Sequence, residues 1–226
     1  MAGVIMKYRS VFDIIGPAMI GPSSSHTAGA ARIGRMARNM LGETPKRADI
    51  LFCGSFAQTY RGHGTDVAIV GGLMGFDTFD TRIKDALSIA KDVGLEINIS
   101  TVDLPDEHPN TAWITMSNDK ECIKIKGISL GGGKIEIVES GGFDMCLTGD
   151  AWTMLVFHRD HYGMIAAIAS VLADHRINIG KMEMYRTARG QEALLVIETD
   201  QGIDMETSHK ISSIQDVGRV SVVPPL

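Results

Sequence analysis

Three serines and a histidine stand together in the run Ile20-Gly-Pro-Ser-Ser-Ser-His-Thr27, directly before an alanine-rich stretch that is typical of a helix. Backbone N–H groups at a helix N-terminus favour anions, and hydroxyl groups add further hydrogen-bond donors. A plain capped loop is the alternative, because serine is common in such loops. The run is denser in polar residues than a cap requires, so we predict a site for a carboxylate or phosphate. Its candidate residues are Ser23, Ser24, Ser25, His26 and Thr27.

Two further segments could contribute histidines to the same site. In Arg61-Gly-His-Gly-Thr-Asp66, two glycines flank His63 and leave its ring accessible. Thr65 and Asp66 stand at the start of the next predicted helix, where Asp66 can cap the helix or fix the tautomer of an imidazole. A surface turn explains this segment equally well. The second segment, His108-Pro-Asn110, occupies a loop between two predicted strands.

The same residue types raise the question of a metal centre. Zinc accepts three histidines, so His26, His63 and His108 are candidate ligands, but none has a helical i, i+4 partner. The three cysteines, Cys53, Cys122 and Cys146, are widely spaced and lack a C-x-x-C pair, so they are expected to be free thiols. We therefore expect this chain to bind no metal by itself.

The elements that position these segments follow from the hydrophobic pattern. A mixed α/β arrangement is predicted for the N-terminal part, with a linker over 141–149 and a turn at Gly131-Gly-Gly133. The expected helices cover 27–41, 65–74 and 81–93, and the expected strands cover 48–56, 95–101, 112–117, 121–126 and 134–138.

The C-terminal part predicts the order β-α-β-β-α-β, a ferredoxin-like sandwich, with a bulge at Gly180. Its strands are expected over 153–158, 177–185, 193–199 and 219–223, and its helices from Gly163 onward and over 205–214. Between the first strand and the first helix lies Asp160-His-Tyr-Gly-Met164, where Gly163 exposes backbone amides that could bind the carboxylate of a small ligand. A tight strand-to-helix turn is the alternative.

Composition excludes several classes of function. The 226 residues carry a net charge of −5 and only 6% aromatic side chains, which argues against binding to nucleic acid or an anionic membrane. Hydrophobic residues make up 44% of the chain, as in a globular protein, and no apolar run is long enough to span a membrane. Residues 1–10 lack the apolar segment of a signal peptide, so a cytoplasmic location is expected.

The motifs together resemble a known family. The run from Ser10 to Thr27 resembles the start of the beta portion of iron–sulfur-dependent L-serine dehydratases, and the segments Gly62-His-Gly-Thr-Asp66, His108-x-Asn110 and Gly131-Gly-Gly133 match further patterns in the same order. This α/β part, residues 1–140, is also similar to the allosteric substrate-binding domain of some phosphoglycerate dehydrogenases. Residues 150–226 resemble an ACT domain, although its usual Pro-Gly is Tyr162-Gly163 here.

The resemblance implies the beta subunit of a two-subunit L-serine dehydratase, which converts L-serine to pyruvate and ammonia in amino-acid catabolism and gluconeogenesis. A separate alpha subunit would hold a 4Fe-4S cluster, and a monovalent cation is possible. The resemblance further implies catalytic roles for His63, His26, Ser24 and Ser25, and substrate binding by Ser23, Thr27, Thr65, Asp66, His108 and Asn110. An amino-acid effector would bind at Asp160, Gly163 and Met164, or the ACT domain would serve for pairing of subunits.

Three other functions compete with this interpretation. A regulatory protein could sense an amino acid through the ACT domain alone, without any cluster-bearing partner. A module of a phosphoglycerate dehydrogenase is disfavoured, because no G-x-G-x-x-G follows a predicted strand. A purely structural chain that stabilises its partner would leave the histidines without a role.

Overall fold

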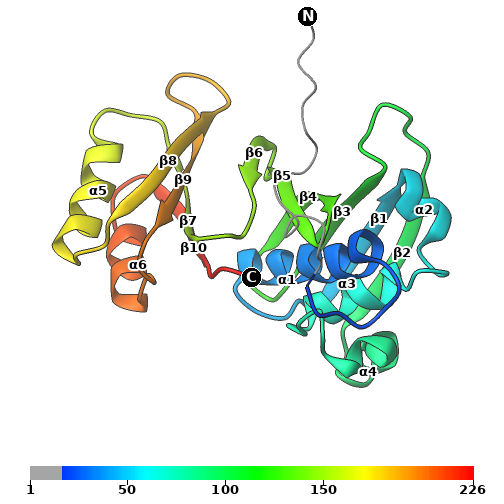
Figure 1. The fold of residues 1–226 in the computed structure, drawn as a ribbon. Helices are drawn as coiled ribbons and strands as arrows, with labels where there is room; N and C mark the ends of the chain where they lie inside the picture. The colour runs from blue at the N-terminus through cyan, green and yellow to red at the C-terminus, as the bar shows by residue number, and fades with distance from the viewer. Residues whose placement is uncertain (1–16) are drawn as a thin grey trace, which may run out of the picture.

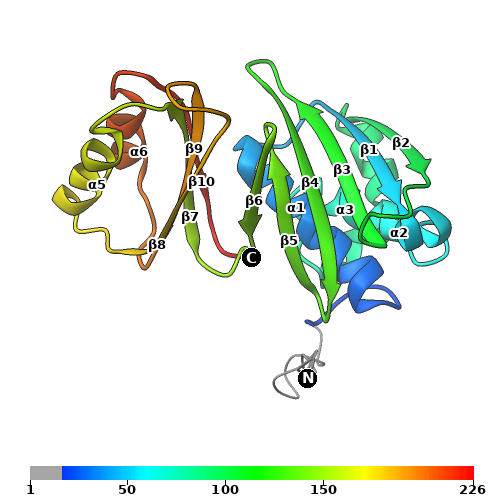
Figure 2. The ribbon, with the colours of Figure 1, turned by 90° about the horizontal axis from the view of Figure 1, so that it is seen from above.

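The computed structural model describes residues 17–226, which form two sheets (Figures 1 and 2). The six-stranded sheet has the order β2-β1-β3-β4-β5-β6, and the four-stranded sheet has the order β10-β7-β9-β8. We call the first sheet with its helices the N-terminal unit, and the second the C-terminal unit. Residues 1–16 lie outside the described residues. They include the segment examined for a signal peptide and the start of the family-like run.

The N-terminal unit contains the predicted mixture of helices and strands. Its helices are the π-helix η2 (Ser24–Ala28), α1 (Gly29–Leu41), α2 (Gly54–Thr59), α3 (Thr65–Leu73), the 3-10 helix η3 (Thr81–Asp85) and α4 (Ala86–Asp92). Its strands are β1 (Arg47–Cys53), β2 (Glu96–Val102), β3 (Asn110–Ser117), β4 (Cys122–Gly131), β5 (Lys134–Ser140) and β6 (Phe143–Leu147).

One face of the six-stranded sheet is covered by helices. Strand β1 pairs in parallel with β2, and the other neighbouring strands are antiparallel. Side chains of β4 alternate between buried and exposed, as expected for a sheet with one covered face. Helices α1 and α3 lie across the covered face (Figure 1). The helix that begins beside the serine run is thereby fixed on a rigid sheet.

Helices α1 and α3 are in backbone contact because glycines face the crossing. A Cβ added at Gly34 would lie 2.1 Å from the Ile69 carbonyl oxygen, and one added at Gly72 would lie 2.0 Å from that of Ala31. The helix predicted over 65–74 is α3, which continues through Gly71 and Gly72 to Leu73, because the packed partner helix compensates for the low helix propensity of the glycines.

The C-terminal unit has the predicted order β-α-β-β-α-β. Its elements are β7 (Trp152–Arg159), α5 (Met164–Asp174), β8 (Ile179–Arg186), β9 (Glu192–Thr199), α6 (Met205–Ser212) and β10 (Val217–Val223). The pairing of β8 with β9 shifts register between Ile179 and Lys181, which confirms the bulge predicted at Gly180. Helices α5 and α6 cover the outer face of this sheet, and its other face turns toward β6 (Figure 2).

Two local predictions were wrong. The segment predicted as a linker contains strand β6, because Gly141 and Gly142 adopt left-handed backbone angles and turn the chain back onto β5. Strand β1 ends at Cys53 rather than at residue 56, and α2 begins at Gly54. Gly54 has φ of +57°, and a Cβ there would lie 2.7 Å from the backbone of Pro109, so the chain leaves the sheet at this position.

The two units share buried surface. Leu155, Leu194, Val196 and Val223 of the C-terminal unit join the hydrophobic core of the N-terminal unit. The N–H of Leu226 also donates to the Gly149 carbonyl at 3.0 Å. Within residues 17–226, no helix combines the length and apolarity needed to cross a membrane.

Candidate active site

The ring of His26 is held between serines on both of its nitrogen atoms. Its Nδ1 lies 3.0 Å from the Ser25 Oγ and 3.4 Å from the Ser23 Oγ. Its Nε2 lies 2.8 Å from the Oγ of Ser55, a residue of helix α2. These contacts restrain the orientation of the imidazole, so His26 is an ordered part of the site.

The serine run is shaped by the start of its helix. Ser23 caps η2, and its Oγ accepts a hydrogen bond from the N–H of His26 at 3.1 Å. The five residues of η2 form a π-helical turn before α1 begins, a local widening that is frequent at functional sites. Just before it, Gly21 has φ of +127°, and a Cβ there would lie 2.4 Å from the Thr27 side chain. Position 21 therefore requires a glycine, which fixes the backbone at the start of the serine run.

His63 lies beside His26, as the sequence predicted for one shared site. The two ring centroids are 4.9 Å apart, and the Thr27 hydroxyl donates to the His63 carbonyl at 3.0 Å. The buried Nδ1 of His63 has no hydrogen-bond partner among residues 17–226.

Thr65 and Asp66 do not orient the His63 ring through that nitrogen. The N-cap of α3 is Gly64, so Asp66 lies inside the first turn of the helix, where its Oδ1 accepts from the N–H of Val67 at 2.9 Å. The hydroxyl of Thr65 is fully buried and lacks a hydrogen-bond partner within the described part of the chain. Both residues start helix α3, so they fix the backbone next to His63 rather than its imidazole.

The loop with His108 and Asn110 connects to the serine run through another serine. Asn110 Nδ2 donates to the Ser129 carbonyl at 3.3 Å, and the Ser129 hydroxyl donates to the Ser25 carbonyl at 2.9 Å. His108 Nδ1 accepts from the N–H of Asn110 at 3.2 Å, so this nitrogen is used within its own loop. Asn110 thus contacts the serine run only through Ser129. The Nδ1 contact of His108 stays within its own loop.

Ser55 and Ser129 are the site residues that sequence reasoning missed. Ser55 fell at the end of a strand that was predicted to continue to residue 56, and Ser129 lay outside every predicted motif. A usable signal was Gly54, since a glycine before a serine after a buried strand indicates a turn where the serine can be exposed. No local pattern pointed to Ser129, whose contact spans more than a hundred residues.

Burial lowers the pKa of two histidines of the candidate site. Desolvation, with a smaller contribution from neighbouring His63, lowers the pKa of His26 below its ordinary 6.5. Desolvation also lowers the pKa of His108. Both imidazoles are therefore neutral at pH 7. A neutral imidazole keeps a basic nitrogen, which is the form needed for accepting a proton.

Comparison with known proteins decides the family. A family model described as serine dehydratase beta chain matches residues 10–140, more than half of the chain. The chain belongs to the serine dehydratase beta chain family. A second model, described as ACT domain, matches residues 152–204, so the C-terminal unit is an ACT domain.

Individual relatives agree with this assignment. The beta chain of a probable L-serine dehydratase from Bacillus subtilis is 55% identical over 218 residues, covering 96% of this chain and 99% of that protein. The L-serine dehydratase beta chain of Peptoniphilus asaccharolyticus is 35% identical and covers 93% and 96%, respectively. A D-3-phosphoglycerate dehydrogenase from Methanocaldococcus jannaschii is 23% identical over 86% of this chain, but only 37% of that enzyme is matched.

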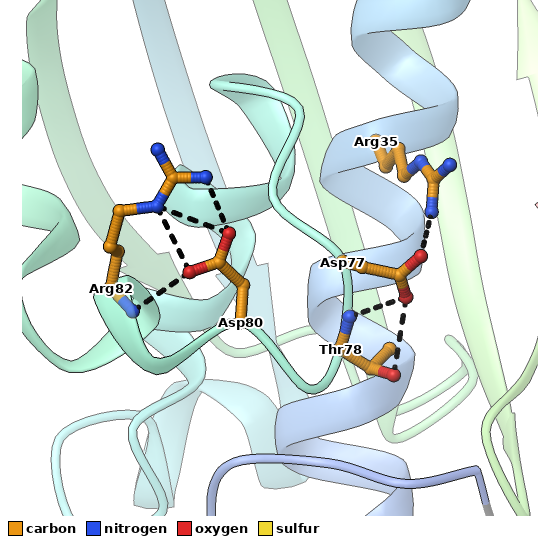
Figure 3. Close-up of polar contacts among 5 residues, drawn as sticks. All are labelled: Arg35, Asp77, Thr78, Asp80 and Arg82. Carbon is orange, nitrogen blue, oxygen red and sulfur yellow. Dashed lines mark hydrogen bonds and ion pairs between the residues drawn. The ribbon is translucent and has the colours of Figure 1, made fainter.

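In this beta chain, the segment before the serine run is anchored to the loop after α3, in which Asp77 and Asp80 pair with Arg35 and Arg82 (Figure 3). Asp77 pairs with Arg35 of α1 at 2.6 Å and accepts from the N–H of Thr78 at 2.7 Å. The Thr78 hydroxyl donates to the Ala18 carbonyl at 2.6 Å, and the Thr78 carbonyl accepts from the N–H of Ile20 at 2.7 Å. In the same loop, Asp80 is paired with Arg82 at 2.6 Å. Helix α1 and this loop therefore fix the position of residues 18–20, which lead into the serine run.

The three effector residues predicted in the ACT domain lie at the turn between β7 and α5. Asp160 Oδ2 accepts from the N–H of Gly190 at 3.1 Å and from Arg186 at 3.3 Å, so this carboxylate joins two loops. Gly163 is the left-handed residue before α5, and Met164 is buried in the core of the ACT domain. Tyr162 is fully exposed, so its ring does not fill a site in this structure.

Replacing Ser55 with alanine should destabilise the protein by about 1–2 kcal/mol, because it leaves His26 Nε2 without its hydroxyl partner. Urea unfolding measures the change. The matched control is Ser170→Ala, an exposed serine of helix α5, which should change the free energy of unfolding by less than about 0.5 kcal/mol. Equal effects of the two substitutions would mean that the Ser55–His26 contact contributes nothing.

Stability should decrease as the pH falls from 7 to 5. The folded protein holds the pKa of His26 below 6.5, so the unfolded chain binds more protons in the window just below that value. The contribution of neutral His26 to the free energy of unfolding is complete above pH 6.5, and it is lost as the pH drops through the lowered pKa of the folded state. His26→Gln should flatten this dependence in thermal unfolding followed by circular dichroism. An unchanged pH slope in the variant would contradict the assignment.

Proposed function

We propose that this beta chain shares the active site of an L-serine dehydratase with an alpha subunit, and that its histidines and serines act on L-serine. One observation supports the proposal: the ring centroids of His26 and His63 are 4.9 Å apart beside several serine hydroxyls, and the Nδ1 of His63 has no hydrogen-bond partner among residues 17–226. Such a cluster offers a base and several hydrogen-bond donors for a substrate carboxylate, and deamination of serine requires both kinds of group.

The reaction sets clear tasks for this chain. L-serine loses its α-proton and its β-hydroxyl, the resulting aminoacrylate tautomerises to an imine, and hydrolysis gives pyruvate and ammonia. The imidazole of His63 would take up a proton next to the neutral ring of His26. The hydroxyls of Ser23, Ser24 and Thr27 would bind the substrate carboxylate, while Ser25 and Ser55 hold His26. Asn110 would support the serine run through Ser129.

The 4Fe-4S cluster belongs to the alpha subunit in this proposal, because the cysteines of this chain do not make a ligand set. Cys53 is buried and points its thiol at the Leu104 carbonyl, and Cys122 is exposed on β4. Burial, together with Glu136, raises the pKa of the Cys146 thiol to about 11, which disfavours a thiolate. In the part of the chain that the structure describes, no three His, Cys, Asp or Glu residues gather as metal ligands.

The proposal extends to regulation and assembly. An amino-acid effector would bind the ACT domain at the turn of Asp160, Gly163 and Met164, and the same domain would pair with a second copy. A monovalent cation would assist the shared site, and the complex would work in the cytoplasm. These assignments rest on the family resemblance and on the exposed turn before α5.

Reconstitution tests the proposed function. The alpha subunit should be produced anaerobically with and without this chain, and pyruvate formation from L-serine should be measured. We expect activity only when both chains are present. Full activity of the alpha subunit alone would leave this chain a structural or regulatory role. Activity of this chain alone, without metal, would refute the shared site.

A further inference from the structure

A cavity of about 520 Å³ lies between the two units, away from His26 and His63. It is walled by the turn before β6, the end of β7, and the first residues of β9 and β10. Its volume falls within the range of small-molecule pockets, roughly 300–1,000 Å³. Neither the active-site residues proposed above nor the predicted effector turn from Asp160 to Met164 lines it. The cavity therefore needs an explanation of its own.

Arg219 is the charged residue on which the argument depends. Its Nη1 pairs with Glu121 Oε2 of the N-terminal unit at 2.9 Å, and its guanidinium carbon lies 4.5 Å from the centroid of the Phe157 ring. Its Nε and Nη2 are shielded from solvent and find no hydrogen-bond partner within residues 17–226. Burial lowers the pKa of this guanidinium, partly opposed by Glu121.

Unpaired donors that are shielded from solvent on a charged group are costly, because these two atoms have lost water without gaining protein acceptors. One carboxylate already binds Nη1, which leaves the Nε and Nη2 donors for a second acceptor. A ligand carboxylate is the acceptor that a guanidinium matches best, since the two planar groups can share two parallel hydrogen bonds. The unmet donors therefore indicate an anionic ligand group.

The rest of the cavity wall is irregular and combines two aromatic rings with polar and charged residues, namely His158, Arg159, Gln191, Glu192 and Asp216. The rings of Phe143 and Phe157 have centroids 6.2 Å apart, and both line the cavity. Strand β10 bulges between Val217 and Arg219, and the lining residue Asp216 has φ of +66°. Bulges and left-handed backbone at residues other than glycine are concentrated at binding sites. The two phenyl rings provide a surface for an apolar body beside the charged group.

We propose that this cavity binds a small carboxylic acid with an apolar body, whose carboxylate pairs with Arg219 and whose apolar part lies against Phe143 and Phe157. Arg219 already connects the two units through Glu121, so an occupant would contact both units at once. Binding at this site would therefore favour the packed arrangement of the ACT domain on the N-terminal unit.

Calorimetric titration of the full chain with 3-phenylpropanoate and with its uncharged amide, 3-phenylpropanamide, tests the proposal. The acid should bind at least about tenfold more tightly than the amide, because only the acid can pair with the guanidinium. Arg219→Gln should reduce binding of the acid to the level of the amide. The control Arg176→Gln, at an exposed arginine outside the cavity, should leave both affinities unchanged.

A second variant separates ligand binding from folding. Glu121→Gln removes the internal carboxylate that competes for Arg219, so the acid should bind several-fold more tightly to this variant. Equal binding of acid and amide to the unmodified chain would overturn the proposal. Unchanged binding of the acid in Arg219→Gln, or its loss in Glu121→Gln, would do the same. None of these titrations requires the alpha subunit, so the outcome is independent of the proposed dehydratase site.

Discussion

His63→Ala should lower the turnover of the reconstituted alpha–beta pair by about a hundredfold or more, the usual contribution of a positioned acid–base group. His63 is the histidine of the cluster whose buried Nδ1 has no partner within the described residues, and its loss removes the base of the proposed mechanism. His26 is held by three serines and keeps its place. The effect should fall mainly on kcat, with KM for L-serine less affected, because the serine hydroxyls remain. Pyruvate formation under anaerobic conditions is the measurement.

The control for this experiment is His209→Ala, at an exposed histidine of helix α6. This variant should keep turnover within about twofold of the unmodified pair, since surface substitutions away from a site have small effects. Circular dichroism should show both variants folded. Turnover of His63→Ala within about threefold of the control would remove His63 from proton transfer and leave His26 as the base.

Gly72→Ala should destabilise the chain by at least about 3 kcal/mol, the upper range for overpacking. The new Cβ would lie 2.0 Å from the Ala31 carbonyl oxygen and 2.7 Å from the Arg35 nitrogen. Both neighbours are backbone atoms of α1 and cannot rotate away. Intrinsic helix propensity acts in the opposite direction, since alanine is favoured over glycine by about 1 kcal/mol. A net loss of stability in urea unfolding therefore reports the helix contact itself.

Gly180→Ala is the matched control, because a Cβ there meets its nearest atom, Asp200 Oδ1, at an ordinary 3.5 Å. This change should cost less than about 1 kcal/mol. The Gly72 variant should also lose turnover with the alpha subunit, since α1 starts directly after the serine run. If Gly72→Ala were as stable as the control, the close crossing of α1 and α3 would be wrong.

Local chemistry made much of this molecule predictable. The alternation and spacing of apolar residues identified the β-α-β-β-α-β order of the C-terminal unit and the bulge at Gly180. The motifs around His26 and His63 were assigned to one site, and the structure brings these two rings together. The order of the elements depends on short-range patterns, in which backbone angles and side-chain periodicity are set by neighbouring residues. The shared site was predicted from residue types, and the contact between the two rings is tertiary.

Other features depended on contacts between distant segments. The strand predicted to continue past Cys53 ends there because Gly54 packs on Pro109. Gly54 by itself indicates a turn, but its contact with Pro109 depends on the fold. The hydroxyl of Ser55 reaches His26 only because α2 turns off the sheet at this point. Similarly, Gly72 is a packing residue only because helix α1 crosses α3 at this position.

The sequence by itself determined the residue types that can do chemistry here, the order of the elements, and the family to which their motifs belong. Tertiary structure decided which of those residues meet: Ser55 and Ser129 join the histidine cluster, and Asp66 turns to its own helix. It also placed Arg219 against Glu121 and Phe157 at the boundary of the two units. The reason is physical, since side-chain contacts across tens of residues depend on packing that no local pattern encodes.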